Sequence, residues 1–502
     1  MRTRGSLFVA IVLLAWAGSG AGDTHYVASG QSIQAALDAA ESGDVVEVAP
    51  GTYTGPGRTD TQPALVDFQG KAVHLCSSGG PAVTTIDGTG YYHVVQCVNG
   101  EGADTILEGF TITGGNADDP GGLEPPIHSG GGGMFNKGSS PTVRNCVFQG
   151  NSAGMYGGAG MFNDGGSPTV SECAFNSNSA NSFGACGGGM YDKGGSATVT
   201  NCTFSRNSSG GSGGGLWGGS VVTNCAFHEN TAEAGGGIAD AGVVTNCTFN
   251  GNGAVMGGGG IESARAVVNC VFVNNSCMGS GGIKSDGVVV NCTFLNNVAL
   301  GVAAIDGAAT VTNCIVWWDS STNTRVQIGG SCVVTYSDVK GGFPGKGNLD
   351  TDPLFVGTED FHLQPDSSCI DAGTNGPAGG LPPTDLEGNS RLLDGNGDGT
   401  AVADMGAYEA PPVSLEQLVQ DLIQEVLDLN LEPRVCASLT AQLQAALRLA
   451  GDGPAANHAG VVGALNGFIK TVAMCRGKKI PEAEAGALIA AALRIVNLLS
   501  RG

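Results

Sequence analysis

The stretch VTNCAFHEN at residues 222–230 decides the fold, because it returns as VTNCTFNGN at 244–252 and as VVNCVFVNN at 267–275. Eight such segments succeed one another, with Val three residues before each Cys and Phe two residues after it in seven of the eight. The cysteines are Cys146, Cys173, Cys202, Cys225, Cys247, Cys270, Cys292 and Cys314. Their intervals are 27, 29, 23, 22, 23, 22 and 22 residues. A period of this kind indicates a solenoid of stacked coils.

A glycine-rich element precedes each segment and carries one apolar residue, in order Met134, Met161, Met190, Leu216, Ile238, Ile261, Ile283 and Ile305. Each coil therefore contains several short strands joined by turns. A single coil cannot bury its own apolar side, so neighbouring coils stack in register and bury it together. The sequence predicts an all-β fold, a right-handed parallel β-helix, with Val, Cys and Phe as interior columns. The Asn that precedes seven of the eight Cys is expected at a left-handed bend, and the Asn five residues after seven of them in a second column.

The cysteines and the glycosylation motifs are interpreted from this geometry. Side chains of stacked coils run parallel, which suits a disulfide poorly, so the eight repeat cysteines are expected to be packing residues. Cys436 and Cys475, near the C-terminus, are the best disulfide candidates. Asn201, Asn246 and Asn291 begin Asn-Cys-Thr motifs, but a packed bend is a poor site for glycosylation.

The flanking segments suggest three parts. Residues 1–22 combine a basic start with a short apolar stretch and small residues, as a signal peptide does, and residues 23–410 are expected to form the β-helix. Within it, residues 31–40 predict a short helix that covers the open end of the stack, and residues 352–409 are expected to end it. Residues 411–502 predict a small all-α module, with Ser414 as a helix N-cap and helices near 415–426, 434–450, 458–474 and 482–499.

Composition limits the partners and the location. The 45 acidic and 22 basic residues leave a net charge of −23, which argues against nucleic acid as a partner. No apolar stretch after the signal peptide is long enough to span a membrane, so no transmembrane anchor is expected. The mature protein is then expected to be secreted, at the cell surface or in the periplasm. The sequence leaves the oligomeric state open.

The repeat and the two ends of the β-helix resemble known families. The paired Gly-Gly-[Ala/Gly]-[Ile/Leu/Met] and Phe-x-x-Asn signals are similar to the repeats of chlamydial polymorphic outer membrane proteins. Residues 25–410, with SIQAAL at 32–37 and DMGAYE at 404–409, resemble secreted pectate-lyase-like β-helix proteins of environmental bacteria, planctomycetes especially. Residues 468–489 resemble the helical module called FIMAH. These resemblances imply the fold and leave the activity open, because one fold hosts many activities.

One motif points to calcium. Asp394, Asn396, Asp398 and Gly399 reproduce the opening of a calcium loop, with side-chain oxygens at alternate positions and Gly at the sharp turn. The twelfth position holds Met405, with Asp404 one residue earlier as the remaining candidate ligand. We therefore expect Ca²⁺ to bind through Asp394, Asn396, Asp398 and Asp404. The alternative is a solvated acidic turn.

A second candidate site is a file of aromatic residues. Strand alternation turns Phe135, Phe162, Tyr191 and Trp217 outward if the apolar residues before them point inward. The flanking polar residues are Asn136, Asn163 and Asp192. Such a file suits the apolar faces of sugar rings, with amides beside it to bind hydroxyls. The alternative is that a loop, for example residues 114–130, covers the rings.

The same outward positions become charged in later coils, as Ala239, Glu262, Lys284 and Asp306. A lysine between two carboxylates is a weak catalytic candidate, and a surface ion-pair ladder is the favoured interpretation. A loop with Asp118, Asp119, Glu124 and His128 is an alternative hydrolase candidate. No signal is specific enough to name a reaction. A binding or adhesion protein that contacts extracellular or envelope polysaccharide is favoured, with a polysaccharide lyase or hydrolase and a purely structural envelope protein as alternatives.

Overall fold

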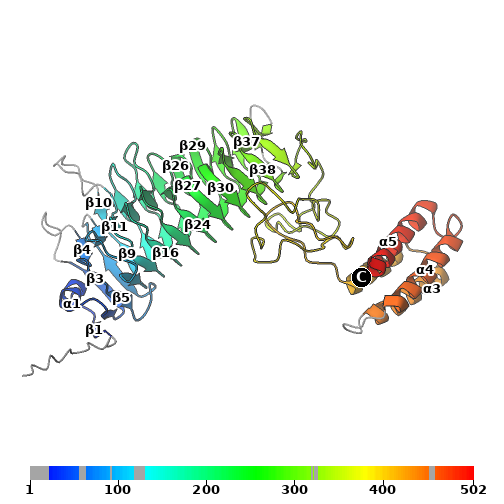
Figure 1. Ribbon diagram of the computed structural model, residues 1–502, viewed down its shortest axis with the longest axis horizontal. Helices are drawn as coiled ribbons and strands as arrows, with labels where there is room; N and C mark the ends of the chain where they lie inside the picture. The colour runs from blue at the N-terminus through cyan, green and yellow to red at the C-terminus, as the bar shows by residue number, and fades with distance from the viewer. Residues whose placement is uncertain are drawn as a thin grey trace, which may run out of the picture.

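A computed structural model describes residues 22–55, 64–90, 93–117, 130–317, 320–321, 326–450 and 458–501. It shows a long stack of coils followed by a bundle of helices (Figure 1). All strand pairs within the stack are parallel among the described residues, apart from isolated bridges in the segment after the coils. The predicted parallel β-helix is thus confirmed. Of the predicted signal peptide, residues 1–21 lie outside the described part of the chain.

Each coil contributes strands to four ladders, which we number in chain order within a coil. The first ladder consists of β4 (Ala64–Asp67), β7 (His93–Cys97), β11 (Met134–Lys137), β15 (Met161–Asp164), β19 (Met190–Lys193), β23 (Leu216–Gly218), β27 (Ile238–Thr245), β30 (Ile261–Val268), β33 (Ile283–Lys284), β37 (Val302–Asp306) and β41 (Val326–Ile328). The second consists of β1 (Thr24–Val27), β2 (Val45–Val48), β5 (His74–Ser77), β8 (Ile106–Glu108), β12 (Thr142–Arg144), β16 (Thr169–Ser171), β20 (Thr198–Thr200), β24 (Val221–Thr223), β34 (Val288–Val290), β38 (Thr310–Thr312) and β42 (Val333–Thr335), with the long strands β27 and β30 shared between the two ladders.

The other two ladders close the coil. The third consists of β3 (Gly51–Thr54), β6 (Thr84–Asp87), β9 (Thr111–Thr113), β13 (Val147–Gln149), β17 (Ala174–Asn176), β21 (Thr203–Ser205), β25 (Ala226–His228), β28 (Thr248–Asn250), β31 (Val271–Val273), β35 (Thr293–Leu295), β39 (Ile315–Trp317) and β43 (Asp338–Val339). The fourth consists of β10 (Asn116–Ala117), β14 (Ser152–Ala153), β18 (Ser179–Ala180), β22 (Ser208–Ser209), β26 (Thr231–Ala234), β29 (Gly253–Met256), β32 (Ser276–Cys277), β36 (Val298–Ala299) and β40 (Ser320–Ser321).

The predicted interior columns are present. From Phe148 to Phe294, seven Phe rings stack almost parallel, with centroids 4.6 to 4.9 Å apart. The eight repeat cysteines are buried free thiols, and in six of them the backbone N–H donates to the sulfur of the next coil at 3.3 to 3.5 Å. Packing thus explains them, as predicted.

The second asparagine column is an amide ladder inside the coils. Each side chain from Asn151 to Asn275 donates from Nδ2 to Oδ1 of the next member at 2.9 to 3.1 Å. The same Oδ1 atoms accept the backbone N–H of the preceding member, as Asn207 Oδ1 does from Asn178 at 3.0 Å. These bonds satisfy groups that the fold buries completely.

The bend before each Cys is left-handed, as predicted. Seven asparagines there have φ between 49° and 56°, and Glu172 takes the same conformation at 54°. Their side chains point outward, and that of Asn201 is exposed. The expectation that this bend is packed is therefore wrong at Asn201. It holds for Asn269, Asn291 and Asn313, which are covered.

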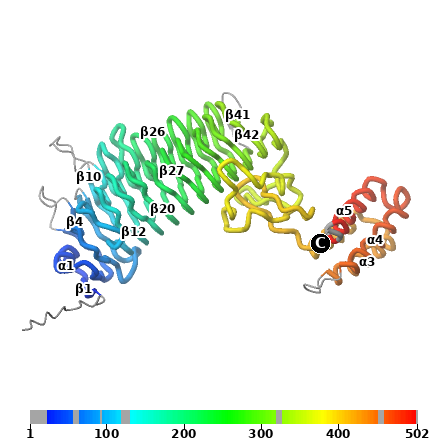
Figure 2. The backbone as a smooth tube through the Cα atoms, viewed as in Figure 1, coloured from blue at the N-terminus to red at the C-terminus, as the bar shows by residue number. Residues whose placement is uncertain are grey.

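Both ends of the stack are covered. Helix α1 (Ile33–Ala39) lies at the first coils, buries Ile33 and Leu37, and begins at Ser32, whose hydroxyl accepts the Ala35 N–H at 3.2 Å. At the other end, residues 349–410, the tail segment, form mostly irregular structure. Figure 2 shows this segment folding back beside the last coils, and hydrogen bonds join it to coil residues as early as Asn269.

The C-terminal part is helical, as predicted. It consists of α2 (Leu415–Asp428), α3 (Pro433–Ala450), α4 (His458–Cys475) and α5 (Glu482–Arg501), with Ser414 accepting the Gln417 N–H as N-cap. Their apolar faces form a separate core. Cys436 and Cys475 are free thiols, so the expectation of a disulfide between them is wrong. Among the residues described, no helix is long and apolar enough to cross a membrane.

Candidate functional site

The outward face of the first ladder carries the predicted aromatic file. The apolar residues from Met134 to Ile328 point inward and are buried, so the next residue in each strand points outward. The strand register places the outward residues of successive coils beside one another, in the order Gln96, Phe135, Phe162, Tyr191, Trp217, Ala239, Glu262, Lys284 and Asp306. The predicted file and its charged continuation are therefore one continuous row.

The aromatic rings are in contact along this row. Their centroids are 5.7 Å apart for Phe135 and Phe162, 4.9 Å for Phe162 and Tyr191, and 4.8 Å for Tyr191 and Trp217. Trp217 meets Tyr191 edge to face, at an interplanar angle of 85°. His93 extends the row by stacking on Phe135 at 4.7 Å.

Only half of the file is open. Phe135 and Phe162 are 7% and 5% exposed, whereas Tyr191 and Trp217 are half-buried. Gly130 lies against the Phe162 ring, since a Cβ there would come within 2.7 Å of its Cδ1, and the buried His93 ring stacks on Phe135. The alternative of a covered file is thus correct for these two rings. Residues 118–129, which hold the acidic loop candidates and His128, lie outside the described residues.

Asn136, Asn163 and Asp192 cannot contact a ligand on this face, because they are almost completely buried. The physical reason is strand alternation, which turns the residue after each outward ring back toward the interior. Asn136 donates to Asn163 at 2.7 Å, and Asp192 accepts from the Ala197 N–H and the Ser220 hydroxyl at 2.9 Å each. Burial raises the pKa of Asp192. The prediction that these three side chains bind a ligand is wrong.

The charged part of the row is accessible. Lys284 is 48% exposed and its Nζ lies 3.7 Å from Oε1 of Glu262, which is 27% exposed. Partial burial raises the pKa of Glu262, and the Asp306 carboxylate raises it further, while Lys284 opposes the shift. A half-exposed pair at this distance is typical of a surface ion pair, the interpretation that the sequence favoured.

A groove of about 750 Å³ runs beside Glu262 and Lys284. Three charged residues that sequence reasoning missed also line it: Asp240, Arg265 and Asp286. Asp240 follows the outward residue of its strand at a φ of 57°, a left-handed kink within a continuous strand. The regular alternation assumed from the sequence does not predict such a kink. The groove thus presents both signs of charge next to the open aromatic rings.

The calcium motif forms a tight loop. Asp394 accepts the N–H groups of Asp398 and Gly399 at 2.9 and 2.8 Å, and Asn396 accepts that of Asp398 at 2.8 Å. Each carboxylate or amide oxygen has two lone pairs, so Asp394 and Asn396 can accept these bonds and still face a cation. The residues of the structure that are described contain no group of three or more acidic, His or Cys side chains that could hold a metal ion. The loop therefore has the residue pattern that opens a calcium site and lacks the closing ligand, because its twelfth residue, Met405, has no oxygen in its side chain.

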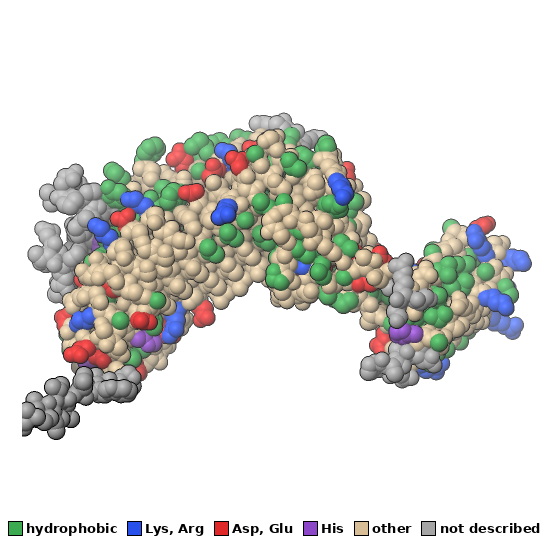
Figure 3. Space-filling model, viewed as in Figure 1, with side chains coloured by type: hydrophobic (Ala, Val, Ile, Leu, Met, Phe, Trp, Pro, Cys, Tyr) green, Lys and Arg blue, Asp and Glu red, His purple; other side chains and the backbone are tan. Residues whose placement is uncertain are grey.

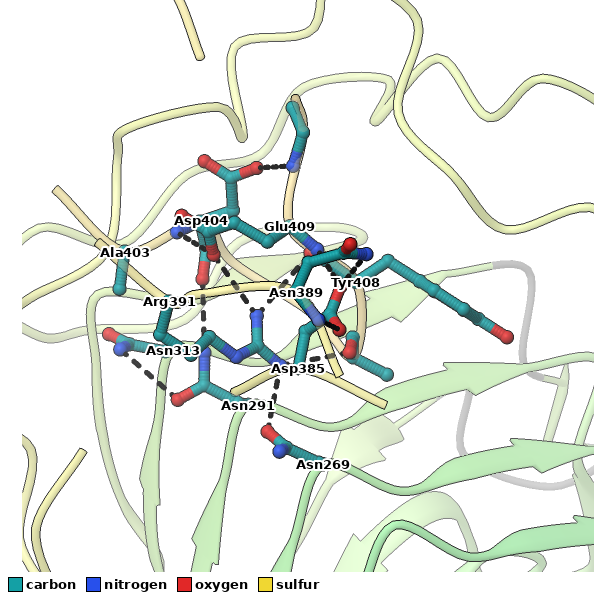
Figure 4. A network of polar contacts seen from close by, with 12 residues as sticks. Asn269, Asn291, Asn313, Asp385, Asn389, Arg391, Ala403, Asp404, Tyr408 and Glu409 are labelled. Carbon is teal, nitrogen blue, oxygen red and sulfur yellow. Dashed lines mark hydrogen bonds and ion pairs between the residues drawn. The ribbon is translucent and has the colours of Figure 1, made fainter. Parts of the chain in front are cut away.

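Asp404 does not belong to this loop. Its side chain is 1% exposed, and its two oxygens accept the N–H groups of Asp371 at 2.7 Å and Ala410 at 2.6 Å. It lies in a buried polar network around Arg391, together with Glu409 (Figure 4). The prediction of Asp404 as a metal ligand is therefore wrong, because its oxygens hold the backbone of the tail segment. The residue that sequence reasoning missed beside the loop is Asp371, which accepts the Asn396 N–H at 2.6 Å.

Comparison with known proteins bears on the fold. The family model for a right handed beta helix region matches residues 69–220 and 137–284. The fold is a right-handed parallel β-helix. A crystal structure of pectate lyase Pel9A is similar over 78% of this chain and 97% of that one, with 17% sequence identity and a TM-score of 0.42. No curated protein sequence matches. The narrower resemblances to polymorphic outer membrane protein repeats, planctomycete proteins and FIMAH modules stay predictions.

Proposed function

We propose that the protein is exported and binds a polysaccharide along the outward face of the first ladder. The observation that carries this proposal is the position of Tyr191 and Trp217. Their half-buried rings lie 4.8 Å apart at the open end of the aromatic file, and the next coil, that of Ala239, already lines the charged groove through Asp240.

The chemistry of a sugar chain fits an aromatic surface that is followed along the axis by a charged groove. The apolar faces of sugar rings pack on aromatic side chains, while the hydroxyls need hydrogen-bonding groups beside them. Tyr191 and Trp217 supply aromatic rings for this packing. Glu262 and Lys284, further along the axis, supply groups that hydrogen-bond hydroxyls. A polymer also suits a row of adjacent subsites, since each contact adds to the binding of one chain. The buried rings of Phe135 and Phe162 continue the row on the other side of Tyr191, and Phe162 packs directly against Tyr191.

The test is to measure glycan binding by Trp217→Ala. We expect the dissociation constant for the best ligand from a glycan array to rise at least ten-fold, because an exposed ring that stacks on sugar is lost while the interior columns are untouched. The control is Phe183→Ala, which removes a ring that is 91% exposed outside the first ladder and should leave binding unchanged. Strong destabilisation by Trp217→Ala, without any glycan bound by the unaltered protein, would contradict the proposal.

A lyase or hydrolase is the second candidate, and Lys284 favours it. This lysine lies in the groove between Glu262 and Asp306, so an accessible ammonium group beside two carboxylates is available to a bound sugar chain. Release of reducing ends or of unsaturated products by the purified protein would favour this candidate over binding alone. The failure of both assays would favour a purely structural role.

Calcium binding by Asp394, Asn396 and Asp398 is also a proposal. With the twelfth ligand missing, we expect a weak site, and free calcium at ten times the dissociation constant would add about 1.4 kcal/mol to the folded state. A chelator should therefore lower the melting temperature by a few degrees, and Asp394→Ala should abolish this response. Asp104→Ala, at an exposed aspartate outside the tail segment, is the control. A melting temperature indifferent to both calcium and chelator would exclude the site.

A further inference from the structure

The left-handed bends before the repeat cysteines form one outward column that runs the length of the repeat. We name it the corner column; its members are Asn145, Glu172, Asn201, Asn224, Asn246, Asn269, Asn291 and Asn313. The tail segment covers the last three members, which are buried. Asn145, Glu172, Asn201 and Asn224 are exposed and Asn246 is half-buried. The column therefore has a covered half and an open half built from the same repeat.

The covered half shows what the column recognises. Asn269 donates from Nδ2 to the carbonyl oxygen of Thr384 at 2.6 Å and accepts at Oδ1 from Nη2 of Arg391 at 2.7 Å. One side-chain amide thus binds a main-chain carbonyl and a guanidinium at the same time.

The next two corners use their amides in the same way. Asn291 donates to the carbonyl oxygen of Asp404 at 3.1 Å. Asn313 forms a reciprocal pair with the peptide unit of Thr374, donating to its oxygen at 3.0 Å and accepting its N–H at 2.8 Å. Three successive corners therefore bind polypeptide, mainly through main-chain atoms.

A groove lies at the edge of the area that the tail segment covers, next to the open half of the corner column. It measures about 500 Å³ and lies between Asn224, Asn246 and Thr248 on the coils and Leu386 and Glu387 on the tail segment. The amides of the open half form one side of this groove, and the tail segment forms the other. The groove therefore continues the surface that the tail segment occupies at the covered half.

We infer that the open half of the corner column binds an extended, arginine-bearing peptide of a partner protein. Continuity with the tail segment argues for polypeptide, since amides of the same type in the same backbone conformation bind it in the three coils that directly follow the open half. Arginine is favoured because Asn269 accepts a guanidinium, and because Glu172 replaces Asn within the open half. Glu387 adds a carboxylate at the wall, and the net charge of −23 attracts a basic partner.

The geometry also sets the length of the peptide. Four coil intervals of about 4.8 Å separate Asn145 from Asn246, so the open half spans about 19 Å, the length of about six extended residues. Such a peptide would run along the solenoid axis and cross the ends of the strands. The threonines and alanines beside the corners leave it few apolar contacts, so binding depends on the amides and charges.

The experiment uses the full chain and two labelled peptides, Gly-Arg-Gly-Arg-Gly-Arg-Gly and its lysine counterpart, in a fluorescence anisotropy titration. Arginine presents a planar fork to an amide oxygen and lysine does not, so we expect the arginine peptide to bind at least five-fold more tightly. Asn224→Gly with Asn246→Gly should weaken its binding at least ten-fold. Glycine keeps the left-handed backbone, so the coils should still form. At Asn246 it also removes the bond that Oδ1 accepts from Nδ2 of Asn269 at 3.0 Å, while Asn269 keeps its bond to the Thr384 carbonyl oxygen.

The matched control is Asn274→Gly with Asn296→Gly. These two exposed asparagines have φ of 56° and 53° and lie at a different bend of the coil. Their replacement should leave peptide binding unchanged. Equal binding of the arginine and lysine peptides, or equal losses from the two double variants, would overturn the inference in favour of general charge attraction. Self-association of the protein that Asn224→Gly with Asn246→Gly abolishes would instead assign the surface to a second copy and also overturn it.

Discussion

Phe227→Asp should prevent the β-helix from folding. The Phe227 ring is completely buried between those of Phe204 and Phe249, at centroid distances of 4.8 and 4.9 Å and within 5° of parallel. An aspartate there places an unpaired charge in the middle of an apolar column, which costs several kcal/mol or more. The loss spreads to both neighbouring coils because each coil is stable only through its contacts with the next.

Two further variants separate the charge from the position. Phe227→Leu keeps the site apolar and should cost roughly 1 to 3 kcal/mol, so the protein should still fold. Phe183→Asp places the same charge at a position where the native ring is 91% exposed, so this substitution should be tolerated. Circular dichroism and resistance to proteolysis are the measurements. A folded, protease-resistant Phe227→Asp would show that the phenylalanine column is not the core.

The coils could be predicted because their interior residues repeat in register. An interior column of Phe, Cys or Asn requires the same residue type at the same position of each repeat. The spacing of these residues in the sequence therefore indicates that the coils stack. The tail segment has no period, and its contacts join residues far apart, such as Asn269 and Arg391, 122 positions away. The sequence does carry a trace of it. One row of outward positions in the third ladder changes from His228 and Asn250 to Val273, Leu295 and Trp317, which pack in one cluster with apolar residues of the tail segment.

The candidate site was predictable only in part, for the same physical reason. Register fixes which side chains share a row, so the file from Phe135 to Trp217 followed from spacing. Exposure depends on the groups that pack over the row, and spacing does not reveal that Phe135 and Phe162 are buried. The inward direction of Asn136 does follow from strand alternation, so the pattern that predicts the file also excludes this side chain from its outward face. The kink at Asp240 needs a left-handed backbone that no repeat letter indicates.

Arg391→Met should release the tail segment from the coils. Arg391 is completely buried, and its guanidinium contacts Oε2 of Glu409 at 3.3 Å and the oxygens of Asn269 and Ala407 at 2.7 and 2.9 Å (Figure 4). Removing one partner of a buried ion pair costs about 3 to 5 kcal/mol, because the other charge stays buried without compensation. Hydrogen exchange of residues 385–410 should therefore accelerate strongly, while that of the coils around Cys202 stays slow. Figure 3 shows only scattered charged side chains on the visible face of the coils, in contrast to the charges that Arg391 and Glu409 bring together in the interior.

The pH dependence of this release identifies the charges responsible. Burial raises the pKa of Asp404 and of Glu409, and their mutual repulsion raises that of Glu409 further. The folded state then holds protons that the unfolded chain releases above about pH 4, so the tail segment is most stable below that pH and loses stability as the pH rises through neutrality. Arg391→Met should consequently be more damaging near pH 8 than near pH 5, where the carboxyl groups can take up protons. Glu409→Gln removes one of these carboxyl groups and should flatten the dependence. The quantity to compare is the protection factor of each amide, which corrects the exchange rate for its intrinsic pH dependence. If Arg391→Met lowered these protection factors by the same factor at both pH values, relative to the unaltered protein, the guanidinium would act through packing and hydrogen bonds rather than through its charge.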